Sequence, residues 1–151
     1  MKIIFLDFDG VLNSAKDFAG CENQGVVINP SKLPLLRQIV SATEARIVLS
    51  TSWREHWSKT PAECDDIGRF IEQTFSFYGL QIFDKTPEFR GKRETQIKFW
   101  LDQHPEVQQF VVLDDMLLNG DFMEGHFVKT SYHFGGLAED DVQEAIRILN
   151  G

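Results

Sequence analysis

The stretch that decides the fold lies close to the N-terminus and reads Ile4-Phe5-Leu6-Asp7-Phe8-Asp9-Gly10-Val11-Leu12. An apolar run ends there on two aspartates at positions i and i+2, followed by a glycine. Such runs are typical of buried parallel strands, so the segment Lys2–Leu6 is predicted to be one. Two neighbouring carboxylates repel one another, and a divalent cation such as Mg²⁺ relieves that repulsion. The alternative is a plain turn in which Asp9-Gly10 only closes the strand.

The rest of the chain alternates predicted strands with predicted helices. Further strands are expected at 46–49, 80–83, 110–113 and 126–129. Helices are expected at 29–42, opened by Asn29-Pro30, at 60–79, opened by a capping box from Thr60 to Glu63, at 92–103, and near the C-terminal end. This alternation predicts an α/β fold, a Rossmann-like three-layer sandwich with a mainly parallel sheet. Ligands bind such sheets at the carboxyl ends of the strands, where this chain places carboxylates and hydroxyls.

Length and composition exclude several classes of protein. A chain of 151 residues, 42% of them hydrophobic, predicts a single domain over 1–151 and excludes intrinsic disorder. A net charge of −8 disfavours a domain-wide basic face for duplex nucleic acid. The apolar run at the start is too short for a signal peptide or a membrane span, so we expect a cytoplasmic protein with no membrane partner. The two cysteines, Cys21 and Cys64, match no metal spacing and are expected to be free thiols.

The sequence resembles the haloacid dehalogenase (HAD) superfamily at four motifs, which occur in the superfamily's order. The Asp7-Phe8-Asp9-Gly10 segment resembles motif I, and the apolar strand that closes on Ser50-Thr51-Ser52-Trp53-Arg54 resembles motif II. Lys92 opens a helix that leads into the next strand, as the motif III lysine does. The apolar strand ending in Asp114-Asp115 resembles motif IV. Four motifs in order are far more specific than any one of them.

The resemblance implies a phosphatase that works through an aspartyl-phosphate on Asp7. Asp9 is then the general acid and base, and an Asp at that position disfavours dehalogenation. Thr51, or Ser50 in its place, is expected to hydrogen-bond the phosphoryl oxygens. Lys92, or the adjacent Arg93, is expected to neutralise the phosphate.

The same resemblance implies the cofactor Mg²⁺. Its ligands are expected to be Asp7, the main-chain carbonyl of Asp9 and Asp114, with Asp115 acting through a metal-bound water. A metal and a cation are physically required, because a dianionic phosphate and a carboxylate repel by about 4 kcal/mol per charge pair at about 4 Å and an effective dielectric near 20. Beside this site, Arg54 is expected to bind the substrate.

The chain has room for a flap at about 13–28 but not for a cap domain, so the resemblance implies a capless enzyme with an open site. The segments Ser50–Arg54, Gly91–Glu94 and Gly135–Leu137 also resemble a small HAD group associated with RNA-repair proteins. Residues 85–98 hold five basic and two acidic side chains, a strip suited to a nucleic-acid end. The alternative for the strip is a solvated helix face.

The expected function is therefore hydrolysis of a phosphomonoester, on a nucleic-acid end or another large phosphorylated substrate. The enzyme alternative is a small-molecule or nucleotide phosphatase. The non-enzyme alternative is a phospho-accepting signalling or binding module. Receiver domains place their paired acids after the first strand and the phosphorylated Asp after the third, whereas this chain has Asp-x-Asp first and Asp-Asp last, which disfavours that alternative. The oligomeric state stays open.

Overall fold

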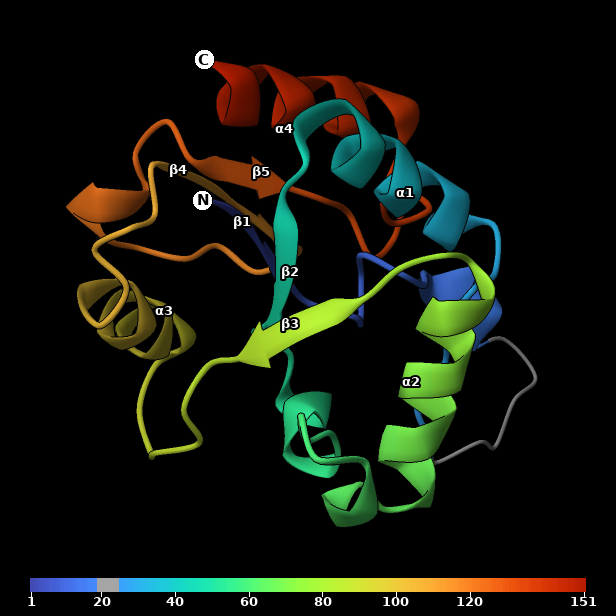
Figure 1. The fold of residues 1–151 in the computed structure, drawn as a ribbon. Helices are drawn as coiled ribbons and strands as arrows, with labels where there is room; N and C mark the ends of the chain where they lie inside the picture. Colours follow the sequence, from blue (N-terminus) through green and yellow to red (C-terminus); the bar gives the residue numbers. More distant parts are fainter. Residues whose placement is uncertain (19–24) are drawn as a thin grey trace.

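The computed structural model describes residues 1–18 and 25–151, and its centre is a sheet of five strands (Figure 1). All neighbouring strands run parallel, in the order β3-β2-β1-β4-β5. The strands are β1 (Lys2–Leu6), β2 (Arg46–Leu49), β3 (Ile82–Lys85), β4 (Gln109–Asp114) and β5 (Phe127–Lys129). The chain winds outward from β1 to β3 and then returns to β4 on the other side of β1. The switch point beside β1 is where such sheets bind ligands.

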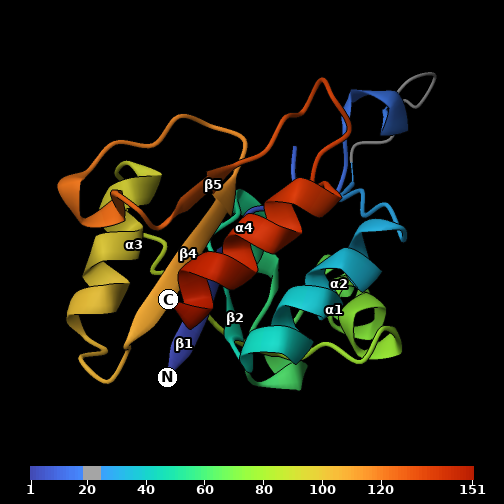
Figure 2. The ribbon, with the colours of Figure 1, turned by 90° about the horizontal axis from the view of Figure 1, so that it is seen from above.

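Helices cover both faces of the sheet, which confirms the predicted three-layer α/β sandwich (Figures 1 and 2). Helices α1 (Lys32–Thr43), α2 (Asp66–Phe77) and α4 (Glu139–Asn150) pack on one face, and α3 (Arg93–Asp102) packs on the other. Successive residues of a strand point to opposite faces, so β1 divides between the two cores. Ile4 and Leu6 lie under the three helices, whereas Ile3 and Phe5 lie under α3.

Helix α1 begins later than Asn29-Pro30, where the sequence predicts its start. The first helical residue is Lys32, and Ser31 is the N-cap. The Asn29 side chain instead accepts hydrogen bonds from the Ser31 backbone N–H at 3.0 Å and from its hydroxyl at 2.8 Å. Asn29 therefore closes a turn of its own in front of the helix.

Helix α2 also begins later than predicted, because a different residue caps it. The expected capping box, Thr60 to Glu63, forms only the short 3₁₀ helix η3 (Pro61–Glu63), and the Thr60 side chain makes no capping bond. Asp65 is the N-cap of α2, and its carboxylate accepts from the Gly68 backbone N–H at 2.9 Å.

The segment between β1 and α1 is described only in part. Of the expected flap at 13–28, residues 19–24 lie outside the described residues. Its first part is buried at Asn13 and Ser14, and the 3₁₀ helix η1 (Ala15–Asp17) follows. No helix in the described part of the chain is long and apolar enough to cross a membrane.

Candidate active site

The register of the sheet places Ser50, Asp7 and Asp114 in one row at the carboxyl ends of β2, β1 and β4. Leu6 pairs with Leu49 on one side and with Leu113 on the other, so the next residue of each strand continues the row. Backbone hydrogen bonds extend it, from Ser50 N to Leu6 O at 3.0 Å and from Asp7 N to Leu113 O at 3.1 Å. By strand alternation, the three side chains share the face covered by α3.

Asp7 lies in a buried cluster of carboxylates. One carboxylate oxygen from each of Asp7, Asp114 and Asp115 lies within 4.8 Å of the others, and the Asp7 and Asp114 residues are 4% and 0% exposed. Burial, and next the charge of Asp114, raise the pKa of Asp7 from its ordinary value of 3.8 to about 8. The same two causes raise the pKa of Asp115. The cluster therefore holds its negative charge only with help from cations.

Arg93, the first residue of α3, supplies one such cation. Its Nη1 lies 3.0 Å from Asp7 Oδ2 and 2.7 Å from Asp114 Oδ2. Burial alone would lower the pKa of Arg93, but the two carboxylates outweigh it and raise that pKa. Lys92, the expected motif III residue, is the N-cap of α3 and is exposed. The structure thus brings Arg93, and not Lys92, into contact with the carboxylates.

The acidic cluster has the chemistry of a magnesium site. One guanidinium against the three carboxylates of Asp7, Asp114 and Asp115 leaves two formal negative charges, the charge that a divalent cation balances. Carboxylate oxygens are the ligands that Mg²⁺ prefers, and this site offers no sulfur or imidazole ligand from the described residues. These residues therefore fit Mg²⁺. Binding of the ion, and its coordination by the Asp9 carbonyl, stay predictions.

The loop after β1 leaves space for Asp115 only because residue 10 is glycine. Gly10 has a φ of +85°, and a Cβ built on it would lie 2.4 Å from the Asp115 carboxylate. The Gly10 carbonyl accepts a hydrogen bond from Thr130 Oγ1 at 2.6 Å, which fixes the loop from the end of β5. Gly10 therefore lets motif I and motif IV approach one another.

The two hydroxyls after β2 have different surroundings. Thr51 is buried, and its hydroxyl accepts from Trp53 N at 3.3 Å, capping the 3₁₀ helix η2 (Ser52–His56). Ser50 is also fully buried, but its Oγ has no hydrogen-bond partner among the described residues. A buried hydroxyl without a partner is unusual, so Ser50 Oγ, in the row with Asp7, is free to bind a ligand.

Asp9 stands apart from the carboxylate cluster and is held by two other residues. Asn13 Nδ2 donates to Asp9 Oδ1 at 2.9 Å, and Trp53 Nε1 donates to Asp9 Oδ2 at 3.1 Å. Neither residue follows from the sequence analysis as part of the site. Asn13 follows Asp9 by four positions in an irregular loop, and Trp53 follows it by 44, so no periodic pattern links them.

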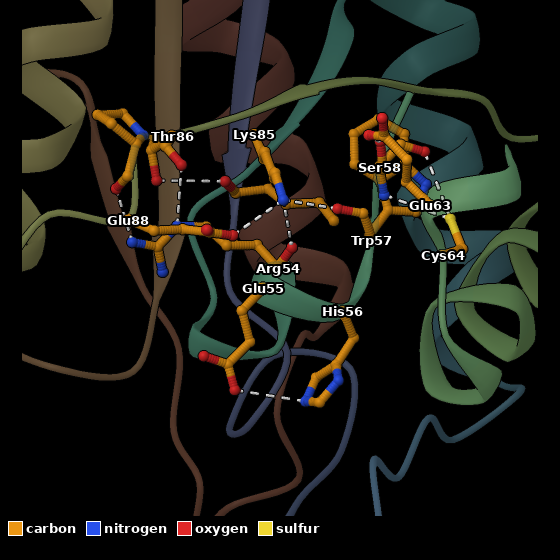
Figure 3. Close-up of polar contacts among 12 residues, drawn as sticks. Arg54, Glu55, His56, Trp57, Ser58, Glu63, Cys64, Lys85, Thr86 and Glu88 are labelled. Carbon is orange, nitrogen blue, oxygen red and sulfur yellow. Dashed lines mark hydrogen bonds and ion pairs between the residues drawn. The ribbon is translucent and has the colours of Figure 1, made fainter. Parts of the chain in front are cut away.

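Arg54, expected to bind the substrate, makes its contacts inside the protein (Figure 3). It is 6% exposed, and its guanidinium donates to the carbonyls of Thr51, Thr86 and Pro87 at 2.8–3.0 Å and to the Gln96 side chain at 3.0 Å. These contacts give Arg54 a structural role, and its expected role in substrate binding stays a prediction. Arg54 ties η2 to the loop after β3 and to α3, and four of its five N–H donors make these bonds. Arg54 also lines a cavity beside Arg93.

The expected basic strip at 85–98 is not one continuous surface. Lys85 Nζ donates to the carbonyls of Arg54 and Trp57 at 3.1 and 2.6 Å and so belongs to the anchoring of η2 (Figure 3). Lys98 pairs with Asp102 one turn further along α3, and Arg93 pairs with the carboxylate cluster. Of its five cations, Arg90 and Lys92 alone are exposed and make no ion pair within the described residues.

A cavity of about 490 Å³ opens beside Arg93, between η2 and the start of α3. Its lining includes Ser52 and Arg54 of η2, Lys92 at the start of α3, and Met116 and Leu117 after β4. Met116 and Leu117 are both at least half exposed, so the cavity opens to solvent beside them.

Groups of this kind, in this order along a parallel sheet, occur together in HAD hydrolases, and this is the class of protein that the fold and the site indicate. Within that class, the chain belongs to the family described as the HAD domain in Swiss Army Knife RNA repair proteins, whose model matches residues 3–142. This match confirms both resemblances seen in the sequence, the one to the HAD superfamily and the one to its RNA-repair group. No curated protein and no solved structure gives a significant match.

Proposed function

We propose that the protein is a Mg²⁺-dependent phosphomonoester hydrolase that works through an aspartyl-phosphate on Asp7. The observation that carries the proposal is the row of Ser50, Asp7 and Asp114, joined by Arg93. The row combines a buried carboxylate with a guanidinium, a further acid and a hydroxyl that has no partner among the described residues. A phosphoryl group needs a nucleophile, hydrogen-bond donors and charge neutralisation, and these residues supply all three.

The reaction proceeds in two steps on the residues of this chain. A carboxylate oxygen of Asp7 attacks phosphorus, the bond from phosphorus to the leaving oxygen breaks, and protonated Asp9 gives its proton to that oxygen. Asp9, now a carboxylate, takes a proton from a water that attacks phosphorus, and the bond to Asp7 breaks to release phosphate. Asp7, the main-chain carbonyl of Asp9, Asp114 and Asp115 would hold Mg²⁺, and the ion would supply charge neutralisation for the approaching phosphate.

Ser50 and Arg93 are the proposed donors to the phosphoryl oxygens. Ser50 Oγ is buried and unpaired among the described residues, whereas the Thr51 hydroxyl caps η2, so the geometry favours Ser50 over Thr51. Arg93 already contacts the nucleophile, whereas Lys92 lines the neighbouring cavity. Lys92 is therefore proposed to attract the substrate and Arg93 to neutralise the transferring group.

The proposed substrate is a terminal phosphate of RNA. The family description names RNA repair proteins, and the open cavity with exposed Lys92 and Arg90 beside it suits an extended polyanion. The net charge of −8 keeps the rest of the surface from binding the polymer. The alternative is a nucleotide or small-molecule phosphatase, which needs no surface beyond the cavity.

Turnover of a substrate panel with Mg²⁺ tests the reaction. The panel compares p-nitrophenyl phosphate, mononucleotides and oligoribonucleotides that carry a 3′- or a 5′-phosphate. Asp7→Asn should abolish turnover of every substrate while the protein stays folded, because an amide cannot form the acyl-phosphate. Asp102→Asn, which changes an exposed carboxylate on α3, is the matched control and should retain activity. A folded Asp7→Asn variant with wild-type activity contradicts the proposal.

The ratio of kcat/KM for a phosphorylated oligoribonucleotide to that for the mononucleotide tests the substrate. The ratio should exceed one at low salt and shrink as salt rises. Arg90→Glu should lower it several-fold, whereas Arg147→Glu, an equal charge reversal near the end of α4, should leave it unchanged. A mononucleotide that proves the better substrate at low salt favours the small-molecule alternative.

A further inference from the structure

Both oxygens of the Asp9 carboxyl accept hydrogen bonds from side chains, one in the same loop and one in η2. Asn13 Nδ2 lies 2.9 Å from Oδ1, and Trp53 Nε1 lies 3.1 Å from Oδ2. The χ2 torsion of an aspartate is broad, so a carboxyl without such contacts samples many orientations. Two donors on its two oxygens restrict the plane of the carboxyl to one orientation.

Asn13 is itself fixed by its surroundings. It is 0% exposed, and its Oδ1 accepts from Gly10 N at 2.9 Å, which identifies the oxygen and the nitrogen of the amide. Asn13 Nδ2 also donates its second hydrogen to the Val27 carbonyl, at 2.8 Å. The amide therefore cannot flip without losing bonds at both ends.

Trp53 is fixed through the 3₁₀ helix that carries it. Arg54 joins η2 to the Thr86 carbonyl at 3.0 Å, and Lys85 Nζ holds the Trp57 carbonyl at 2.6 Å (Figure 3). The Trp53 ring also packs against His56, with 5.8 Å between ring centroids. The end of β3 and the loop after it thus hold η2 in place and fix the indole N–H over Asp9.

We propose that Trp53 and Asn13 are positioning residues for the general acid and base, so that proton transfer by Asp9 depends on them. The inference rests on the proposed function and deepens it. A carboxylate oxygen has two lone pairs, so each Asp9 oxygen can accept its donor and still carry the transferred proton. In the first step the leaving oxygen receives the electron pair of the breaking bond to phosphorus and the proton from Asp9. Correct orientation of that proton is what the two donors provide.

Leaving groups differ in their need for this proton. An alkoxide is strongly basic and leaves slowly unless Asp9 protonates it, whereas dinitrophenolate is weakly basic and leaves without a proton. The kcat/KM value reports the steps up to release of this leaving group. The ratio of kcat/KM for glycerol 2-phosphate to that for 2,4-dinitrophenyl phosphate therefore measures how well Asp9 donates. A loss of fold or of metal lowers both values and leaves the ratio unchanged.

The experiment measures this ratio in the Mg²⁺-loaded protein and in three variants. Trp53→Phe keeps the ring and removes the N–H, and it should lower the ratio about tenfold, part of the 10²–10⁴ that general acid catalysis contributes. Trp57→Phe is the matched control, because the Trp57 indole donates to Glu72 at 2.7 Å and does not contact Asp9. It should leave the ratio at the wild-type value. Asp9→Asn removes the acid itself and should therefore lower the ratio more than either tryptophan variant.

A second readout does not depend on activity. The three tryptophans give three indole N–H signals in NMR, and each indole donates to a different carboxylate: Asp9, Glu72 and Asp84. Asp9→Asn should move the Trp53 signal and leave the other two in place. This measurement stands even where Trp53→Phe fails to fold.

The outcomes separate this inference from the proposed function. An unchanged ratio in folded Trp53→Phe, or an unmoved Trp53 signal in Asp9→Asn, overturns the positioning role while the phosphatase proposal stands. An Asp9→Asn variant with the wild-type ratio overturns the role of Asp9 itself, and with it the proposed mechanism.

Discussion

Replacing Ser50 by alanine should make the protein more stable and a worse enzyme. Its hydroxyl is 0% exposed and has no hydrogen-bond partner among the described residues. A buried polar group left unpaired costs about 1–3 kcal/mol, and the small cavity left by the oxygen offsets part of the gain. We therefore expect Ser50→Ala to raise the free energy of unfolding of the ligand-free protein by about 1 kcal/mol. For a chain of this size, that raises Tm by about 2–4 °C.

Activity should change in the opposite direction. If Ser50 Oγ donates to a phosphoryl oxygen, its loss removes one donor from the transition state, and such a loss costs about 10²–10³ in kcat. Thermal unfolding in excess chelator measures the first effect, and turnover of p-nitrophenyl phosphate with Mg²⁺ measures the second.

Thr51→Ala is the matched control for this experiment. The Thr51 hydroxyl has a structural partner, Trp53 N, so its removal should destabilise the protein by about 0.5–2 kcal/mol. Its effect on kcat should be smaller than that of Ser50→Ala. The reasoning is refuted if Ser50→Ala is destabilised as Thr51→Ala is, or if it retains wild-type turnover.

The remaining predictions concern the carboxylate cluster and its glycine. Because the pKa of Asp7 rises from 3.8 to about 8 on folding, the metal-free protein should lose stability as pH rises between these values, by up to about 1.4 kcal/mol per pH unit. Thermal unfolding over that range in excess chelator should show this slope, and Asp7→Asn should flatten it. Asp114→Asn should weaken Mg²⁺ binding in calorimetry and lower turnover with it; wild-type affinity would contradict the ligand role. Gly10→Ala should lower the free energy of unfolding more than Gly125→Ala, because both residues have a positive φ but only residue 10 faces Asp115. Equal losses in denaturant unfolding would show that this contact does not matter.

Sequence alone predicts the central part of this fold well. Apolar runs that end on carboxylates, such as Lys2–Leu6 before Asp7, are strong signals for buried parallel strands, and the five strands lie close to the expected positions. The helix starts are less well predicted, because a cap depends on which side chain reaches the free N–H groups. Asp65 makes that contact for α2, whereas Thr60 does not, although the segment from Thr60 to Glu63 matches a capping box.

The sequence identifies the motifs of the candidate site, but long-range contacts decide which residue of each motif reaches the carboxylates. The choice between Ser50 and Thr51 depends on where the strand ends, and sheet register decides which of the two shares a face with Asp7. Arg93 contacts the carboxylates instead of Lys92 because Lys92 is the N-cap of α3, outside the first helical turn. Arg54 looks like a substrate ligand by its charge, but two of the three carbonyls that it binds come from a loop more than 30 residues away. Such contacts have no periodicity that a sequence could display.

The row at the sheet edge also divides the site into rigid and adjustable parts. Serine and aspartate have short side chains with few torsions, so the positions of Ser50, Asp7 and Asp114 follow directly from the backbone of buried strands. Arg93 has a long side chain with many rotamers, and it reaches the same point from the neighbouring helix. In the proposed reaction the phosphoryl group moves from the substrate to Asp7 and then to water, and the guanidinium can follow the charge while the sheet stays still. The adjustments of this site during the reaction should therefore lie in the Arg93 side chain, and not in the strands that carry the proposed nucleophile.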